Sequence, residues 1–134
     1  MPGFPHSGSI RQFFVLLVEV LGIKKPPKLL YVEPQTNETT RGKYTAKTNT
    51  VRIYESNIPD HYCQRMGVLA HEMWHAYQEM KASYRNGKNH LYKYNNGHYI
   101  DSKDDYAGYR FQLVESEAFY FGDNVKQIVS DLCN

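Results

Sequence analysis

Two histidines and one glutamate lie close together in the segment LAHEMWHAYQ, residues 69–78. His71 and His75 are four positions apart, and positions four apart lie on the same side of an α-helix, so both imidazoles can reach one metal ion. Glu72 falls beside this pair, where its carboxylate can take a proton from water without binding the metal. This H-E-x-x-H pattern is typical of zinc metallopeptidases, because zinc lowers the pKa of a bound water to about 7.

A helix that happens to carry two surface histidines is the alternative interpretation. The surrounding sequence favours the metal site, because apolar residues recur at helical spacing over residues 61–80. The apolar stripe through Leu69, Met73 and Ala76 lies almost opposite both histidines on a helical wheel. We therefore expect one face of this helix to anchor it and the other face to present the histidines.

A catalytic zinc ion has three protein ligands and one open position, so a third ligand must come from elsewhere in the chain. A metzincin would carry this ligand at position 81, where the chain has lysine. The remaining candidates are Glu115, Glu117, His90 and His98. On a helical wheel Glu115 shares its face with Ala118 and Gly122, whose small size would let two helices approach closely. Bulkier residues share the face of Glu117, so the wheel favours Glu115.

The segment LVESEAFYFG, residues 113–122, resembles the gluzincins, whose third ligand is a glutamate on the helix that follows the H-E-x-x-H helix. Within that group the chain is similar to small ImmA/IrrE-type metallopeptidase domains, which carry E-x-x-A and then a phenylalanine. Glu115, Ala118 and Phe121 match this pattern. The resemblance covers about residues 43–125, and it implies that Glu115 is the third zinc ligand.

One position departs from these relatives, which commonly carry Asp or Asn four residues after the ligand glutamate to orient a metal-binding histidine. The chain has Phe119 there, so either another group holds His71 or His75, or the metal binds more weakly. SprT-like proteins resemble the layout more distantly and add a zinc ribbon, for which this chain lacks the cysteines.

Several elements are expected to position these residues. Helices are expected at 9–21, 61–80 and 105–130, a strand at 29–33, and a hairpin from GKYTA to TVRIYES at 42–56. Residues 1–8 read as a flexible arm and residues 81–104 as a long loop or flap. We predict one α+β domain over residues 1–134, in which a small, largely antiparallel sheet packs on the H-E-x-x-H helix. The Glu-bearing helix would lie on the other side, as in a minimal zincin-like fold.

Composition argues against several other functions. The net charge of +2 is too small to indicate nucleic acid or an anionic membrane, and the apolar segment 13–23 is too short to span a bilayer. Cys63 and Cys133 match no metal-ligand spacing and do not resemble a disulfide framework, so we expect a reducing compartment, the cytoplasm, with a single bridge between them as the alternative. Nothing in the sequence indicates an oligomeric state.

The expected function is zinc-dependent hydrolysis of a peptide or protein substrate, with Glu72 as general base and then general acid. TVRIYES would act as an edge strand that binds the substrate. Tyr106 or Tyr109 can stabilise an oxyanion, or either can serve only in aromatic packing. Trp74 can line the site or pack in the interior. The alternatives are a zinc-binding regulatory or interaction module that cleaves nothing, and a DNA-associated protein that uses the lysines and tyrosines of residues 81–104.

Overall fold

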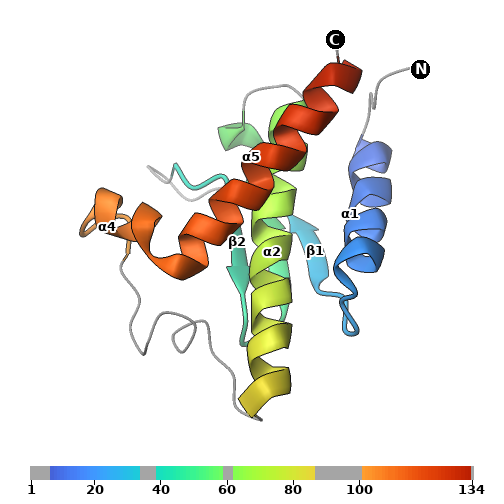
Figure 1. Ribbon diagram of the computed structural model, residues 1–134. Coiled ribbons are helices and arrows are strands. Elements are labelled where there is room, and N and C mark those ends of the chain that lie inside the picture. The colour runs from blue at the N-terminus through green and yellow to red at the C-terminus, as the bar shows by residue number, and fades with distance from the viewer. Residues whose placement is uncertain (1–6, 34–38, 59–61, 87–100, 134) are drawn as a thin grey trace.

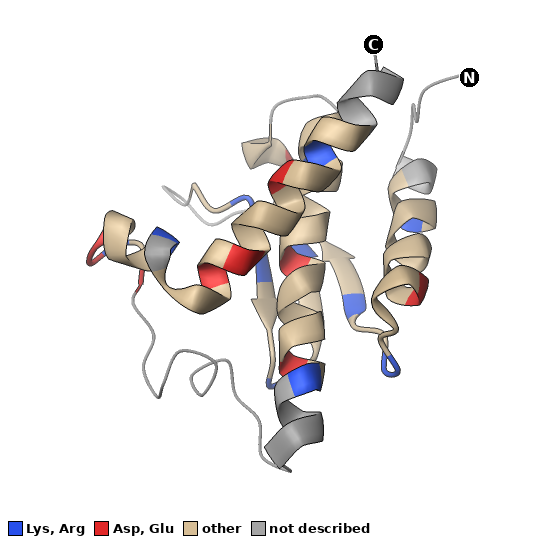
Figure 2. Cartoon of the chain, viewed as in Figure 1, with Lys and Arg blue, Asp and Glu red and all other residues tan. Residues whose placement is uncertain are grey.

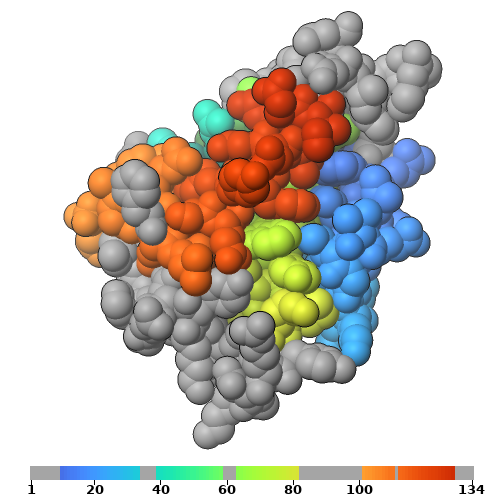
Figure 3. Space-filling view, in the orientation of Figure 1, coloured from blue at the N-terminus to red at the C-terminus, as the bar shows by residue number. Residues whose placement is uncertain are grey.

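The computed structural model describes residues 7–33, 39–58, 62–86 and 101–133, which fold around one long central helix (Figure 1). The elements in chain order are α1 (Ser7–Leu21), β1 (Lys28–Tyr31), β2 (Gly42–Thr45), β3 (Thr50–Ile53), the 3-10 helix η1 (Glu55–Asn57), α2 (Tyr62–Asn86), α4 (Tyr106–Phe111) and α5 (Leu113–Cys133). The sheet lies behind α2 in this view, α1 lies to one side, and α5 crosses the front of α2. Acidic and basic residues are spread over several elements (Figure 2). In the space-filling view α5 covers part of α2 (Figure 3).

The three strands form one mixed sheet in the order β1-β3-β2. The α+β class is confirmed, but the expectation of a largely antiparallel sheet is wrong, because β1 pairs with β3 in parallel and β2 pairs with β3 antiparallel. The third strand is inserted between the two earlier ones, so it has a neighbour on each side. TVRIYES is therefore the inner strand, and the edge strand that faces α2 is β2.

The core lies between α1, the sheet and one face of α2. The apolar stripe expected on α2 is buried, since Met66, Leu69 and Met73 are fully inaccessible. Helix α1 ends at Leu21 and is followed by Gly22, which has a φ of +65°, as its position after the apolar run predicts. The helix begins at Ser7, so the last two residues of the arm expected at residues 1–8 are helical, and residues 1–6 lie outside the described part of the chain.

Helix α2 continues to Asn86, six residues beyond the predicted end. The loop predicted for residues 81–104 therefore begins too early, because the chain has no glycine or proline between Met80 and Gly87 to stop the helix. Residues 87–100 lie outside the described part of the chain. His90 and His98 fall there. So do the lysines and tyrosines on which DNA binding was considered, except Lys103, which lies in the turn before α4.

The helix predicted for residues 105–130 is divided in two by Gln112, whose ψ of 148° is extended. Asp105 caps the first piece, because its carboxylate accepts a hydrogen bond from the Gly108 backbone N–H. Ser116 Oγ donates to Arg110 O across the break, at 3.2 Å. The helical wheel drawn for residues 105–130 therefore applies only to the residues after Gln112, which belong to α5.

Cys63 is buried and disulfide-bonded, so the expectation of reduced cysteines is wrong for this residue. The chain has one other cysteine, Cys133, whose side chain lies outside the described part. Disulfides are typical of oxidising compartments, so the cysteines no longer argue for the cytoplasm. Among the described residues, every helix is too short or too polar to cross a membrane.

Candidate metal centre

The site forms where α2 and α5 cross at two glycines. A Cβ atom added at Gly122 would lie 2.9 Å from the Gly67 backbone oxygen and 3.2 Å from His71 Cβ. Ala118, one turn earlier on α5, is fully buried. Ala118 and Gly122, the small residues on the same face as Glu115, thus allow the backbones of α2 and α5 to pack closely. This close packing places Glu115 next to the histidines of α2.

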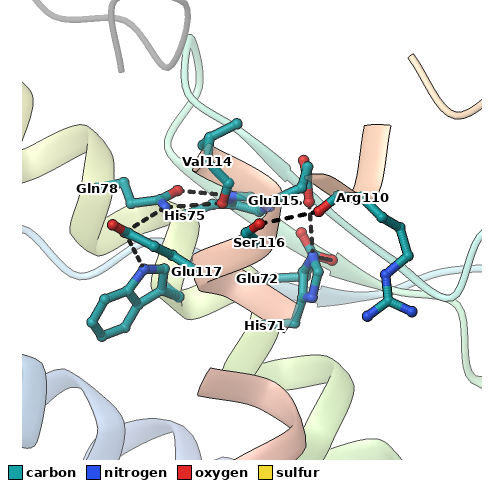
Figure 4. Close-up of polar contacts among 10 residues, drawn as sticks. His71, Glu72, His75, Gln78, Arg110, Val114, Glu115, Ser116 and Glu117 are labelled. Carbon is teal, nitrogen blue, oxygen red and sulfur yellow. Dashed lines mark hydrogen bonds and ion pairs between the residues drawn. The ribbon is translucent and has the colours of Figure 1, made fainter. Parts of the chain in front are cut away.

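Both histidines point at one oxygen of Glu115 (Figure 4). Glu115 Oε1 lies 3.2 Å from His71 Nε2 and 3.1 Å from His75 Nε2. In a tetrahedral zinc site, bonds of about 2.0–2.1 Å leave the ligand atoms about 3.3–3.4 Å apart. The three atoms therefore fit around one ion with little movement of either helix.

Glu72 lies beside this group and is less well placed to be a ligand than Glu115. Its Oε2 is 4.0 Å from His71 Nε2, and the ligand atoms of His71, Glu72 and His75 all lie within 4.8 Å of one another. The carboxylate is buried and accepts a hydrogen bond from the Tyr44 backbone N–H of β2. Burial raises the pKa of Glu72, against the lowering effect of the two imidazoles. A carboxylate with a raised pKa can both accept and release a proton.

Gly42 makes the close approach of β2 to this carboxylate possible. A Cβ atom added there would lie 2.7 Å from Val68 Cγ1 and 3.0 Å from Glu72 Cγ. Any larger residue would push the strand away from α2 or displace Glu72. The requirement for glycine depends on a contact between two distant elements, so no local pattern marks it.

Gln78 orients His75, and sequence reasoning missed it. Gln78 is fully buried, and its Oε1 lies 2.9 Å from His75 Nδ1. Its amide nitrogen donates to Val114 O at 2.9 Å and to Glu117 Oε1 at 3.1 Å. Because both acceptors face the nitrogen, the amide oxygen must face His75. Nδ1 therefore carries the proton, and Nε2 is the nitrogen left for a metal. Phe119 stands where ImmA/IrrE-type domains commonly carry an Asp or Asn that orients a metal-binding histidine. Gln78 does this for His75 from a different position.

The other glutamate of α5 belongs to the network behind His75. Glu117 Oε1 accepts from Trp74 Nε1 at 3.0 Å and from the Gln78 amide. The Trp74 ring packs against Tyr77 and Phe121. Of the two roles considered for Trp74, lining the site and packing, these contacts support packing. Glu117 therefore supports the residue that holds His75, whereas Glu115 faces both Nε2 atoms.

Aromatic rings hold the other histidine. The Phe119 ring meets His71 edge-on at a centroid distance of 4.5 Å, and the Arg110 guanidinium lies 3.9 Å from the Phe119 centroid. Phe119 therefore positions the imidazole by packing.

Tyr109 reaches the site, whereas Tyr106 lies at its rim with 59% of its surface exposed. The Tyr109 side chain forms a hydrogen bond with Glu115, and burial together with the nearby carboxylates raises its pKa. Its hydroxyl is thus a neutral donor beside the candidate ligands.

Burial lowers the pKa of His75, but the hydrogen bond and charge of Glu115 outweigh it and raise this pKa to about 9.

Comparison of the chain with protein families, curated proteins and solved structures found no match. The case for an activity therefore depends on the residues of the site.

Proposed function

We propose that this protein is a zinc-dependent metallopeptidase in which His71, His75 and Glu115 hold the ion. The observation that carries the proposal is the convergence of both Nε2 atoms on one oxygen of Glu115, at 3.2 and 3.1 Å. Two imidazoles and one carboxylate are a donor set typical of catalytic zinc, which keeps a further position open. The tautomer set by Gln78 would leave the lone pair of His75 Nε2 available to bind an ion.

Zinc in this site would act as a Lewis acid that makes water nucleophilic near neutral pH and polarises a peptide carbonyl. Glu72 takes the proton from the attacking water and then delivers it to the leaving amine. The Tyr44 N–H fixes the carboxylate for this work, and burial keeps its pKa raised. Tyr109 O–H borders the same cavity and donates to the oxyanion that develops on the carbonyl.

The edge strand β2 provides a place for the peptide. The Tyr44 N–H points to Glu72, so it faces away from β3. Alternate residues of a strand direct their backbone groups to the same edge, so the Gly42 N–H and C=O also face outward. A peptide that pairs with Gly42 as an added strand passes beside His71 and Glu72, which line the same cavity.

Zinc content and cleavage, measured together, test the proposal. We expect one zinc per chain after dialysis against a weak chelator, loss of zinc in Glu115→Ala, and weaker retention in the matched Glu117→Ala variant. Glu72→Gln should keep zinc and lose cleavage of a peptide mixture followed by mass spectrometry. Zinc retained in full by Glu115→Ala would contradict the ligand assignment. Zinc binding without cleavage by the parent protein would favour a zinc-binding regulatory module.

A further inference from the structure

A cavity of about 390 Å³ lies beside the candidate metal centre. Its lining on α2 extends from His71 and Glu72 back to Gln64. Seven residues of an α-helix span about 10 Å, which is the length of about three residues of extended peptide. Gly67 and Gly122, where the helices cross, also line it. The cavity is therefore large enough for the side chain of a residue near the bond to be cleaved.

Basic residues from two different elements line this cavity. Arg41 lies on the segment leading into β2, and Lys126 lies on α5. Basic positions on both segments are visible in Figure 2. The Lys126 stem lies along α2, since its Cβ is 3.3 Å and its Cδ 3.6 Å from the position of a Cβ at Gly67. Packing of the stem restricts the ammonium group to this part of the surface.

Neither cation is neutralised within the described part of the chain. Among the described residues, neither the Arg41 guanidinium nor the Lys126 ammonium forms an ion pair or a side-chain hydrogen bond. Apart from Glu72, the described lining includes one acidic residue, Asp123, which is exposed. Outside the metal centre, the described lining therefore carries two cations and one anion.

We infer that this cavity takes the acidic side chain of a peptide substrate, and that Arg41 and Lys126 recognise its carboxylate. The inference rests on the proposed function, because residues assigned to metal binding and catalysis line the cavity. Arginine can bind a carboxylate through two parallel hydrogen bonds, and lysine adds a second positive charge. From the length of the cavity, the acidic residue lies within about three positions of the cleaved bond.

Cleavage-site profiling tests the inference. The zinc-loaded protein would digest a mixed peptide library, and mass spectrometry would give the residues flanking each cut. Arg41 is exposed and Lys126 half-buried, so we expect Asp or Glu to be enriched at one flanking position by about two- to fivefold for each cation, the effect of a surface charge pair. Arg41→Gln with Lys126→Gln should remove the enrichment. Lys28→Gln with Lys47→Gln is the matched control, since both lysines are exposed and lie outside the cavity.

A binding measurement separates this inference from the proposed function. The zinc-loaded Glu72→Gln protein would select peptides from a random library, with and without the Arg41 and Lys126 substitutions. Cuts without acidic enrichment, or enrichment that survives loss of both cations, would overturn the inference and leave the peptidase. Acidic peptides retained through Arg41 and Lys126 without any cleavage would support the cavity assignment and reject the peptidase. Neither cleavage nor selective binding would overturn both.

Discussion

Replacing Gln78 by leucine removes the oxygen that accepts from His75 Nδ1, at nearly constant volume. The imidazole can then rotate or take the other tautomer, which puts a proton on the nitrogen that faces the metal. Loss of such a hydrogen-bond partner behind a metal-binding histidine typically weakens metal affinity by about 10–100-fold. We expect a fall of this size in zinc affinity for Gln78→Leu, measured by competition with a chelator of known affinity.

The same substitution should also destabilise the zinc-free protein. It leaves the Val114 carbonyl and the Glu117 carboxylate each short of one donor, in a place where Gln78 is fully buried. An unsatisfied buried group costs about 1–3 kcal/mol, so we expect a loss of about 2–4 kcal/mol in the free energy of unfolding. Gln12→Leu, on the exposed side of α1, is the control and should change neither quantity. Zinc affinity within threefold of the parent value would refute the argument that Gln78 sets the tautomer of His75.

The two glycine contacts and the charge of His75 give further predictions. Gly122→Ala should lower stability by about 1–3 kcal/mol and weaken zinc binding, because its Cβ would lie 2.9 Å from a backbone oxygen. Gly67→Ala should be milder, because its Cβ would lie 3.3 Å from Lys126 Cβ and 3.5 Å from the Gly122 backbone oxygen. Thermal unfolding and zinc titration compare the two variants. Gly42→Ala should lower kcat far more than zinc content, because its Cβ would displace Glu72 and not the ligands. For the zinc-free protein, the His75 pKa is raised from 6.5 to about 9, so its contribution to stability is complete below pH 6.5 and is lost as pH rises toward 9. Urea unfolding at pH 6 and pH 9.5 should show this loss, and His75→Asn should reduce it.

Local periodicity explains which elements were predictable. The apolar stripe of α2 and the Gly22 stop of α1 involve neighbouring residues, and both were confirmed. The parallel pairing of β1 with β3 was missed, because strand order depends on how distant segments come together. The break at Gln112 was missed for a related reason. Its hydrogen bonds join the end of α4 to the start of α5, and the residue itself carries no helix-breaking signal.

The same distinction holds within the site. His71, Glu72 and His75 could be recognised because their chemistry fits within one turn of a helix. Gln78 stands three positions after His75, on the same side of the helix, and this spacing is the one local signal that could have identified it. Its function became visible only when α5 supplied Val114 and Glu117 as acceptors for its amide.

The crossing of the two helices also explains why α5 carries two glutamates with different tasks. Glu115 and Glu117 are two positions apart, so their side chains leave the helix about 200° apart and cannot both face the same group. His75 offers one nitrogen to each side: Nε2 meets Glu115 directly, and Nδ1 meets Glu117 through Gln78. Glu115 therefore completes the donor set, while Glu117 orients the Gln78 amide, which in turn orients the His75 imidazole. Removing Glu117 should loosen the ring without removing a ligand, which is why we expect weaker zinc binding in Glu117→Ala and its loss in Glu115→Ala.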